Sequence, residues 1–207
     1  LIMGILNVTP DSFSDGGQYT NTELAVQHAI QMIEDGADLI DIGGESTRPG
    51  SIEVGIEEEL ARVIPVIEAI HRVAPHIPLS VDTYKAEVAR KAIHAGAHII
   101  NDIWRGIGDP QMLATAAELS VPIILMHNRQ DRNYTNLISD IIEDLKESIT
   151  LALRAGVKED NIILDPGIGF AKDYVENMRV MVKLDTLAQL GYPILLATSR
   201  KKFIRTA

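Results

Sequence analysis

The sequence predicts an α/β fold of the (β/α)8 barrel (TIM barrel) class, and three observations support this. Short runs rich in Ile, Leu and Val recur along the whole chain, as in strands buried on both faces of a parallel sheet. An amphipathic, helix-like stretch separates each run from the next. No change in composition divides the 207 residues. We therefore expect a single barrel domain over residues 1–207.

The apolar runs and the stretches between them predict each element in order. Strands are expected at Leu1–Leu6, Asp38–Ile42, Ile77–Val81, His98–Ile100, Val121–Met126, Asn161–Leu164 and Tyr192–Ala197. Helices are expected at Thr22–Asp35, Ile56–Ala74, Lys85–Ala95, Pro110–Leu119, Leu137–Ala155 and Tyr174–Leu190. Gly36, Gly96, Gly156 and Gly191 follow helical stretches, where a left-handed residue typically ends a helix.

These elements make six complete βα units and a seventh strand, whereas a full barrel typically needs about 250 residues. We therefore expect the eighth unit to be missing from the chain. The first strand begins at Leu1, so the start is expected to be incomplete as well. A doubly wound open sheet is the competing architecture, although no glycine-rich dinucleotide fingerprint follows the first strand.

Composition excludes several classes of protein. With 46% hydrophobic and 23% charged residues, the chain is neither disordered nor fibrous. We find no apolar run of about 18 residues and no basic signal peptide, and we expect a cytoplasmic protein. The absence of cysteine excludes disulfides and thiolate metal sites. A net charge of −10 argues against general nucleic-acid binding, although Arg200, Lys201, Lys202 and Arg205 form one basic segment.

Polar residues stand where each predicted strand ends. In chain order they are Asn7, Asp41, Asp82, Asn101–Asp102, His127–Asn128, Asp165 and Ser199–Lys201. In a barrel these ends meet at one mouth, which is where active sites lie. Asp82, Asn101 and Asp165 directly follow apolar runs, where an unpaired polar group is costly. We favour a shared ligand with many hydrogen-bonding atoms over ordinary surface exposure.

Two loops are longer than the usual two to six residues of a βα connection. Residues 7–17 and 43–50 combine glycines with hydroxyls, carboxylates and Arg48, and such loops can bind an anion or cover a site. The Glu57–Glu59 run near a helix start is interpreted as a complement to the helix dipole. His127 lies at the expected mouth, but its spacing from other residues indicates no metal triad.

Seven segments carry a specific family resemblance. In chain order they read NVTPDSFSDGG, DIGGESTRPG, SVDTYKAEVA, AGAHIINDI, PIILMHN, ILDPGIGFAK and TSRKKFI. Together they resemble the dihydropteroate synthase family over essentially the whole chain. The resemblance implies a (β/α)8 barrel, usually a homodimer, that acts in folate biosynthesis. Its reaction joins 6-hydroxymethyl-7,8-dihydropterin diphosphate to 4-aminobenzoate and releases diphosphate, and sulfonamides compete with the aminobenzoate.

The resemblance assigns roles residue by residue. It implies pterin binding by Asp82, Asn101, Ile103, Met126, Asp165 and Lys201. It implies diphosphate binding by Asn7 and Thr47, with Asn7 also coordinating Mg²⁺. It implies aminobenzoate binding by Arg48, Phe170 and Lys202, with Asp11, Ser14 and Asp15 in a closing loop. Asp15, Arg48 and Lys201 are the residues expected to take part in catalysis.

The chain departs from the family pattern near its end. An Arg-x-His segment that helps to bind diphosphate lies beyond Ala207 in the family. Lys202 stands where many relatives have Ser, close to the aminobenzoate carboxylate, and residues 205–207 differ from the usual helix start.

Three rival functions stay open. A pterin-binding methyltransferase barrel would share the residues Asp82, Asn101 and Asp165, with less need for Lys201. A barrel aldolase would use Lys201 as a Schiff-base nucleophile, although the flanking Arg200 and Lys202 favour a charged ligand contact. A pterin-binding protein without turnover is the third alternative.

Overall fold

The structure is a computed structural model that describes residues 1–9, 18–46, 53–199 and 201. Its residues group into two compact units, Leu1–Asn101 and Asp102–Ala207. Within the described ranges, no helix is long and apolar enough to cross a membrane.

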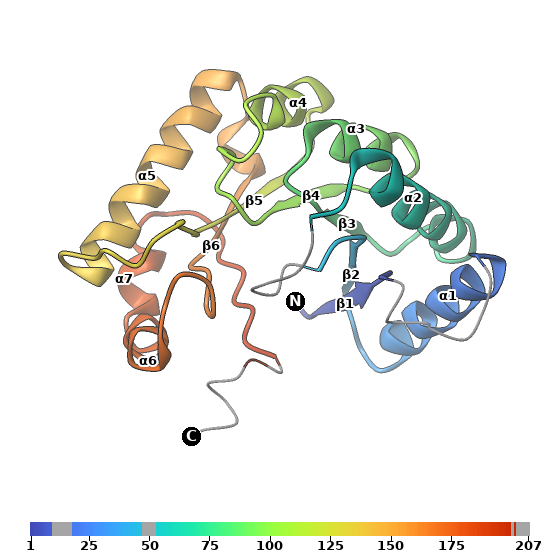
Figure 1. Ribbon diagram of the computed structural model, residues 1–207, viewed down its shortest axis with the longest axis horizontal. Coiled ribbons are helices and arrows are strands. Elements are labelled where there is room, and N and C mark those ends of the chain that lie inside the picture. Colours follow the sequence, from blue (N-terminus) through green and yellow to red (C-terminus); the bar gives the residue numbers. More distant parts are fainter. Residues whose placement is uncertain (10–17, 47–52, 200, 202–207) are drawn as a thin grey trace. The chain divides into compact units, whose positions relative to one another are not determined.

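The first unit alternates strands with helices in the predicted order. Its strands are β1 (Met3–Asn7), β2 (Leu39–Gly43), β3 (Leu79–Asp82) and β4 (Ile99–Asp102), and its helices are α1 (Gln18–Glu34), α2 (Ile56–Val73) and α3 (Ala86–His94). Each strand pairs in parallel with the next one along the chain. The helices lie along one side of these strands (Figure 1).

The strands of this unit separate an apolar face from a polar one. Ile40 and Ile42 of β2 are fully buried in one core cluster with Ile67 and Ile70 of α2. Because side chains alternate along a strand, Asp41 lies on the face opposite these isoleucines. The apolar runs thus contain single polar residues that point away from the helices.

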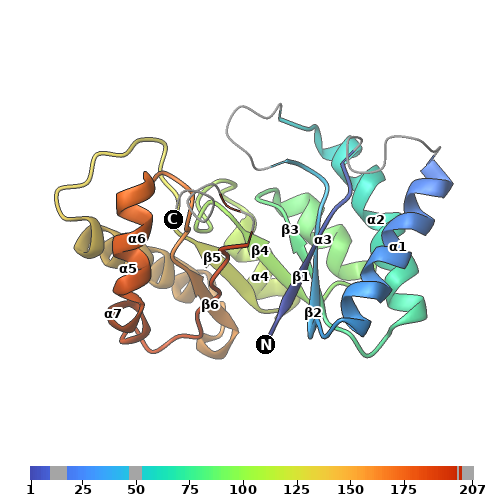
Figure 2. The ribbon, with the colours of Figure 1, turned by 90° about the horizontal axis from the view of Figure 1, so that it is seen from below.

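The second unit repeats the alternation. It contains α4 (Met112–Leu119), β5 (Ile123–Met126), α5 (Leu137–Ala155), a 3₁₀ turn η2 (Glu159–Asn161), β6 (Ile162–Asp165), α6 (Tyr174–Val182) and α7 (Leu184–Ala188). The strands β5 and β6 are parallel, and α5, α6 and α7 lie to one side of them (Figure 2). Asn136 caps α5 by accepting a hydrogen bond from the Ser139 amide, and an Asp173–Glu176 capping box starts α6.

The structure corrects three of the predicted elements. The strand expected at Asp38–Ile42 is β2, Leu39–Gly43, and it ends one residue later because Gly43 still pairs with both neighbouring strands. Within the described ranges, the expected seventh strand is only an isolated bridge between Leu164 and Ile194. The helix expected at Tyr174–Leu190 is interrupted at Lys183, whose amide closes a tighter turn on the Val180 carbonyl at 3.0 Å.

The predicted helix-terminating glycines are confirmed. Gly36, Gly96, Gly156 and Gly191 have φ values of 104°, 116°, 96° and 86°, all in the left-handed region.

Candidate active site

One level of the first unit carries the predicted polar residues in lateral register. Asn7 pairs with Gly43, Gly43 with Asp82, and Asp82 with Asn101, all at the carboxyl ends of their strands. A Cβ atom on Gly43 would lie 3.4 Å from Asp82 Oδ2 and 3.5 Å from Asn7 Oδ1. Side-chain oxygens of Asn7 and Asp82 therefore flank Gly43, which adds no side chain of its own.

A second level lies one step earlier along the same strands. Asp41 of β2 pairs with Ser80 of β3, and both are buried. Ser80 Oγ donates a short hydrogen bond to Asp41 Oδ1, and Asn101 Nδ2 donates to Asp41 Oδ2 at 3.2 Å. Burial raises the pKa of Asp41, and these two hydrogen bonds act in the opposite direction. Asp41 thus connects the buried level to Asn101 in the level above.

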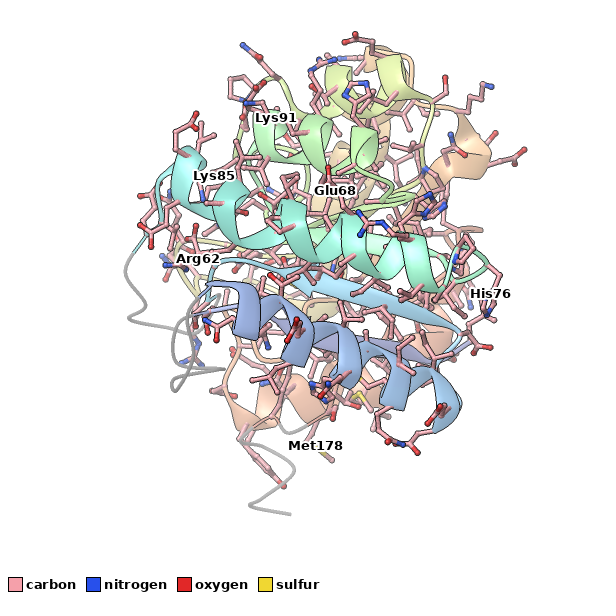
Figure 3. All side chains as sticks on the ribbon, turned by 90° about the vertical axis from the view of Figure 1, so that its right-hand side faces the viewer. Arg62, Glu68, His76, Lys85, Lys91 and Met178 are labelled. Carbon is pink, nitrogen blue, oxygen red and sulfur yellow. The ribbon has the colours of Figure 1, made fainter. Side chains whose placement is uncertain are left out.

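A buried cation lies beside the start of the β2–α2 connection. Lys85 Nζ donates to Glu45 and, at 2.5 Å, to Glu59 of α2, which is 1% exposed. Burial acts to lower the pKa of Lys85, but both glutamates outweigh it and hold that pKa above its usual value. Arg62 donates to the Gly44 carbonyl at 2.7 Å. Figure 3 shows Lys85 and Arg62 at the same end of α2.

In the second unit, the carboxyl ends of β5 and β6 bring predicted residues together. Met126 pairs with Asp165, and their side chains are 3% and 2% exposed. Asp165 Oδ1 accepts a hydrogen bond from the Gly167 amide at 2.7 Å, so its side chain also fixes the start of the next loop. Ile103 is buried after β4.

The loop after β6 adopts an unusual backbone. Gly167, Gly169 and Ala171 all have positive φ, and a Cβ atom on Gly167 would lie 1.8 Å from the His127 carbonyl oxygen. Lys172 Nζ, which is buried, donates to the carbonyls of Gly167 and Phe170, each at 3.0 Å. The loop is therefore held from inside by one buried cation.

Lys201 joins this loop from the seventh predicted segment. Its Nζ donates to the Ile168 carbonyl and lies 4.9 Å from the centroid of the Phe170 ring. Burial lowers the pKa of Lys201, while the charge of Asp165 raises it. The structure thus brings Phe170 and Lys201, two residues implied by the resemblance, into contact.

Behind the loop lies a chain of charged and polar groups that the sequence did not predict. His127 Nε2 lies 2.9 Å from Asp144 Oδ2, which also accepts from Arg129 Nε at 2.6 Å. Burial acts to raise the pKa of Asp144, but Arg129 and Arg105 outweigh it and lower that pKa. In the described part of the chain, His, Asp and Glu side chains nowhere gather in threes to hold a metal ion.

The predicted site residues thus fall into two groups and a remainder. Asn7, Asp82 and Asn101 share one level of the first unit. In the second unit, Met126 and Asp165 end β5 and β6, and Lys201 lies over Phe170 in the loop after β6. Asp11, Ser14, Asp15, Thr47, Arg48 and Lys202 lie outside the described residues. The roles assigned to all of these side chains stay predictions.

The contacts of Lys85 and Lys172 and the buried hydrogen bonds of Asp41 are not predicted by the sequence. Glu59 was interpreted as a complement to the helix dipole, whereas its carboxylate is buried against Lys85. Lys172 directly follows a glycine-rich loop, which is a sequence signal for its contacts with the Gly167 and Phe170 carbonyls, but its third partner, His127, lies 45 residues away.

Comparison with known proteins identifies close relatives of the chain. Residues 3–207 match the model of the family described as "Pterin binding enzyme". The chain is 62% identical over 204 residues to a dihydropteroate synthase of Bacillus subtilis, covering 99% of this chain and 71% of that protein. It is 57% identical to a dihydropteroate synthase of Clostridium beijerinckii, of which it covers 76%.

Solved structures that are similar to the chain are also of dihydropteroate synthases. A crystal structure of a dihydropteroate synthase from Clostridium difficile, determined in the presence of pteroic acid, matches with a TM-score of 0.96 and 48% identity. That match covers 99% of this chain and 78% of the other. A Xanthomonas albilineans dihydropteroate synthase with 4-aminobenzoic acid matches with a TM-score of 0.94 and 47% identity, covering 99% and 75%.

Proposed function

The chain belongs to the dihydropteroate synthase family of pterin binding enzymes, and from this premise we propose how its residues divide the work of the reaction. The predictions of a (β/α)8 barrel and of a transferase of folate biosynthesis are confirmed. The reaction joins 6-hydroxymethyl-7,8-dihydropterin diphosphate to 4-aminobenzoate and gives 7,8-dihydropteroate and diphosphate. The observation that carries the assignment of residues is the single level shared by Asn7, Asp82 and Asn101.

The edge of a pterin ring presents an amino group, ring N–H groups and a carbonyl. Asp82 and Asp165 can accept hydrogen bonds from the N–H groups, Lys201 can donate, and Asn101 can do either. Their places at the carboxyl ends of strands or beside the β6–α6 loop support this assignment. Met126 and Ile103, both buried and apolar, would contact the ring faces.

Mg²⁺ fits the oxygen atoms of the first unit, as a partner of the diphosphate. Asn7 Oδ1 and Asp82 Oδ2 both border Gly43, and a hard cation takes such oxygens while keeping several waters. We assign Asn7 as the protein ligand and Thr47 as a donor to the diphosphate. When bound, Mg²⁺ would supply positive charge to the departing diphosphate.

The second substrate requires an apolar surface and a cation. Phe170 can pack against the aminobenzoate ring, and Lys201 Nζ already lies over the Phe170 ring, 4.9 Å from its centroid. Arg48 and Lys202 would bind its carboxylate, and Asp15 would close the first loop over it. Arg48 is suited to an anionic oxygen because its guanidinium is permanently charged and forked.

The chemistry follows from a good leaving group. The C–O bond to diphosphate breaks, the arylamine nitrogen bonds to the same carbon, and the amine loses a proton. A dihydropterin ring can delocalise positive charge on that carbon, so departure before attack needs no strong base. Asp82 and Asp165 would favour this transient charge, while Arg48 stabilises the leaving diphosphate. The remaining rate enhancement would come from holding both substrates in line and excluding water.

Three further properties belong to the same proposal. Sulfonamides would compete with aminobenzoate because they resemble it. A homodimer is supported by apolar side chains exposed along α6, namely Tyr174, Val175, Met178 and Val182. A cytoplasmic location is supported by the substrate, because a diphosphate does not diffuse through a bilayer. Sedimentation of the purified protein tests whether it is a dimer. Titration of the reaction with sulfathiazole tests competition with aminobenzoate, and cell fractionation tests the location.

The decisive experiment is diphosphate release by the purified protein with pterin diphosphate, Mg²⁺ and 4-aminobenzoate. We expect release that requires the aminobenzoate and is abolished by a chelator, and a loss of about 100-fold or more in kcat/KM for D82N or D165N. Exposed Lys91→Met is the control and should match the wild type. Pterin binding without release would favour the non-catalytic alternative, and methyl transfer from methyltetrahydrofolate would favour the methyltransferase.

The aldolase alternative has its own test. Lys201 Nζ is occupied by the Ile168 carbonyl and the Phe170 ring, which supports a ligand contact rather than a nucleophile. Borohydride with a carbonyl substrate should therefore leave the mass of the protein unchanged. A stable adduct on Lys201 would overturn this assignment.

A further inference from the structure

Asp41 is a buried carboxylate for which the proposed reaction has no use. It lies two residues before Gly43 in β2, so it faces the same side of the sheet one level below Asn7, Asp82 and Asn101. Its side chain belongs to a residue that is only 5% exposed, and burying a carboxylate in such a place is costly unless it is well hydrogen-bonded.

Each oxygen of Asp41 has its own donor. Ser80 Oγ donates to Oδ1, and the Asn101 amide nitrogen donates to Oδ2 at 3.2 Å. Ser80 is fully buried and Asn101 is 8% exposed. Asp41 therefore reaches past β3 to hold a side chain of β4 that is assigned to the pterin.

This contact determines how the Asn101 amide is oriented. An ionised carboxylate only accepts hydrogen bonds, whereas an amide has a donating nitrogen and an accepting oxygen. In the structure the nitrogen end of Asn101 donates to Asp41 Oδ2, and the carbonyl oxygen is directed away from it. Without a fixed partner, the two ends of an amide are nearly identical in shape and could exchange.

We propose that Asp41 is a positioning residue that fixes Asn101 as a hydrogen-bond acceptor for an N–H group on the edge of the pterin ring. This inference rests on the proposed function, since it takes a pterin as the ligand of Asn101. It adds a specificity rule to the site: the ligand atom opposite Asn101 carries a hydrogen. Ser80 supports Asp41 from the other oxygen without touching the amide.

An exchange of the two side chains tests the rule. N101D alone places two carboxylates against each other across 3.2 Å and should weaken binding of pterin diphosphate by about 10-fold or more at pH 8.5. Adding D41N restores a donor opposite the new carboxylate and again directs an accepting oxygen toward the ligand. D41N/N101D should therefore return to within about 3-fold of the wild type.

Isothermal titration with pterin diphosphate, without aminobenzoate, gives the dissociation constants. If the double variant is folded and binds no better than N101D, the amide nitrogen is what the ligand needs and the inference fails. If the wild type itself binds no pterin diphosphate, the proposed function fails instead. The two failures are therefore distinguishable.

Ser80→Ala separates positioning from simple support of the fold. It removes one buried hydrogen bond to Asp41 but leaves the Asn101 contact, so the affinity for pterin diphosphate should stay within about 2-fold. D41N, which can turn either amide end toward Asn101, should lower that affinity by more. Equal losses in S80A and D41N would show that Asp41 is only structural, and this comparison holds even if N101D does not fold.

Discussion

Lys172 Nζ lies 3.0 Å from His127 Nδ1, and the other nitrogen of the same imidazole lies 2.9 Å from Asp144. Asp144 accepts a hydrogen bond from the protonated Nε2, so the unprotonated Nδ1 accepts one from the lysine. Burial, together with the charge of Lys172, lowers the pKa of His127 to about 3. The neutral histidine thus links a buried lysine to a carboxylate.

Lys172 should make stability rise with pH above neutrality. Burial lowers the pKa of Lys172 from 10.5 to about 7. Between these values the unfolded chain holds a proton that the native protein has lost, so the free energy of unfolding increases by up to about 1.4 kcal/mol per pH unit. Urea unfolding of wild type and K172M from pH 7.5 to 9.5 measures the slope. K172M should have a clearly shallower slope, with a remainder from Lys201, whose pKa burial also lowers. The exposed control K146M should keep the full slope, and an unchanged slope in K172M contradicts the prediction.

His127 should make the free energy of unfolding fall at acid pH. The pKa of His127 is about 3 in the native protein and about 6.5 in the unfolded chain. Near pH 6 the unfolded chain therefore binds a proton that the native protein does not. Stability therefore declines as pH falls below about 6.5, by up to about 1.4 kcal/mol per unit. Unfolding measured between pH 5 and 6.5 should show a shallower decline in H127Q than in the wild type. H76Q, at an exposed histidine, serves as the control and should decline like the wild type.

The strand ends of the site could be predicted because their signal is local. Asp82, Asn101 and Asp165 each follow an apolar run directly, and the parallel fold carries such positions to the carboxyl ends of the strands. The same local signal places Asp41 at a strand end and does not predict its hydrogen bonds. Its donors lie 39 and 60 residues away in the sequence, and only the register of the folded strands brings them together.

The buried cations could not be predicted for the same reason. Lys85 is separated from Glu45 by 40 residues and from Glu59 by 26, and no periodicity connects them. The run that contains Glu59 is compatible with an exposed helix start, and burial alone distinguishes the two interpretations. The loop that Lys172 holds depends on left-handed residues, whose sequence signal is a glycine but whose contacts are tertiary.

Gly167 should tolerate no side chain. Its φ of +68° and the 1.8 Å approach of a Cβ atom to the His127 carbonyl oppose alanine on two grounds. G167A should lose about 3 kcal/mol or more of unfolding free energy. Gly191 has a similar φ of +86° with nothing within 4 Å, so G191A should lose only about 1 to 2 kcal/mol. Urea denaturation of both variants isolates the clash, and equal losses would show that no clash exists.

Lys85 should contribute more to stability than any exposed lysine of its unit, because the buried Glu59 and the partly buried Glu45 both pair with it. K85M leaves Glu59, 1% exposed, without its cation, and breaking one side of a buried pair typically costs about 3 to 5 kcal/mol. Lys91 forms an exposed pair with Glu87 on α3, so K91M should cost less than about 0.5 kcal/mol. Figure 3 shows both lysines on the first unit.

Replacing the partner as well, in K85M/E59M, should recover part of the loss in unfolding free energy, since no buried charge then remains at position 59. Urea denaturation of the three variants measures these differences, and a double variant less stable than K85M would show that Glu59 is stabilised by groups other than Lys85.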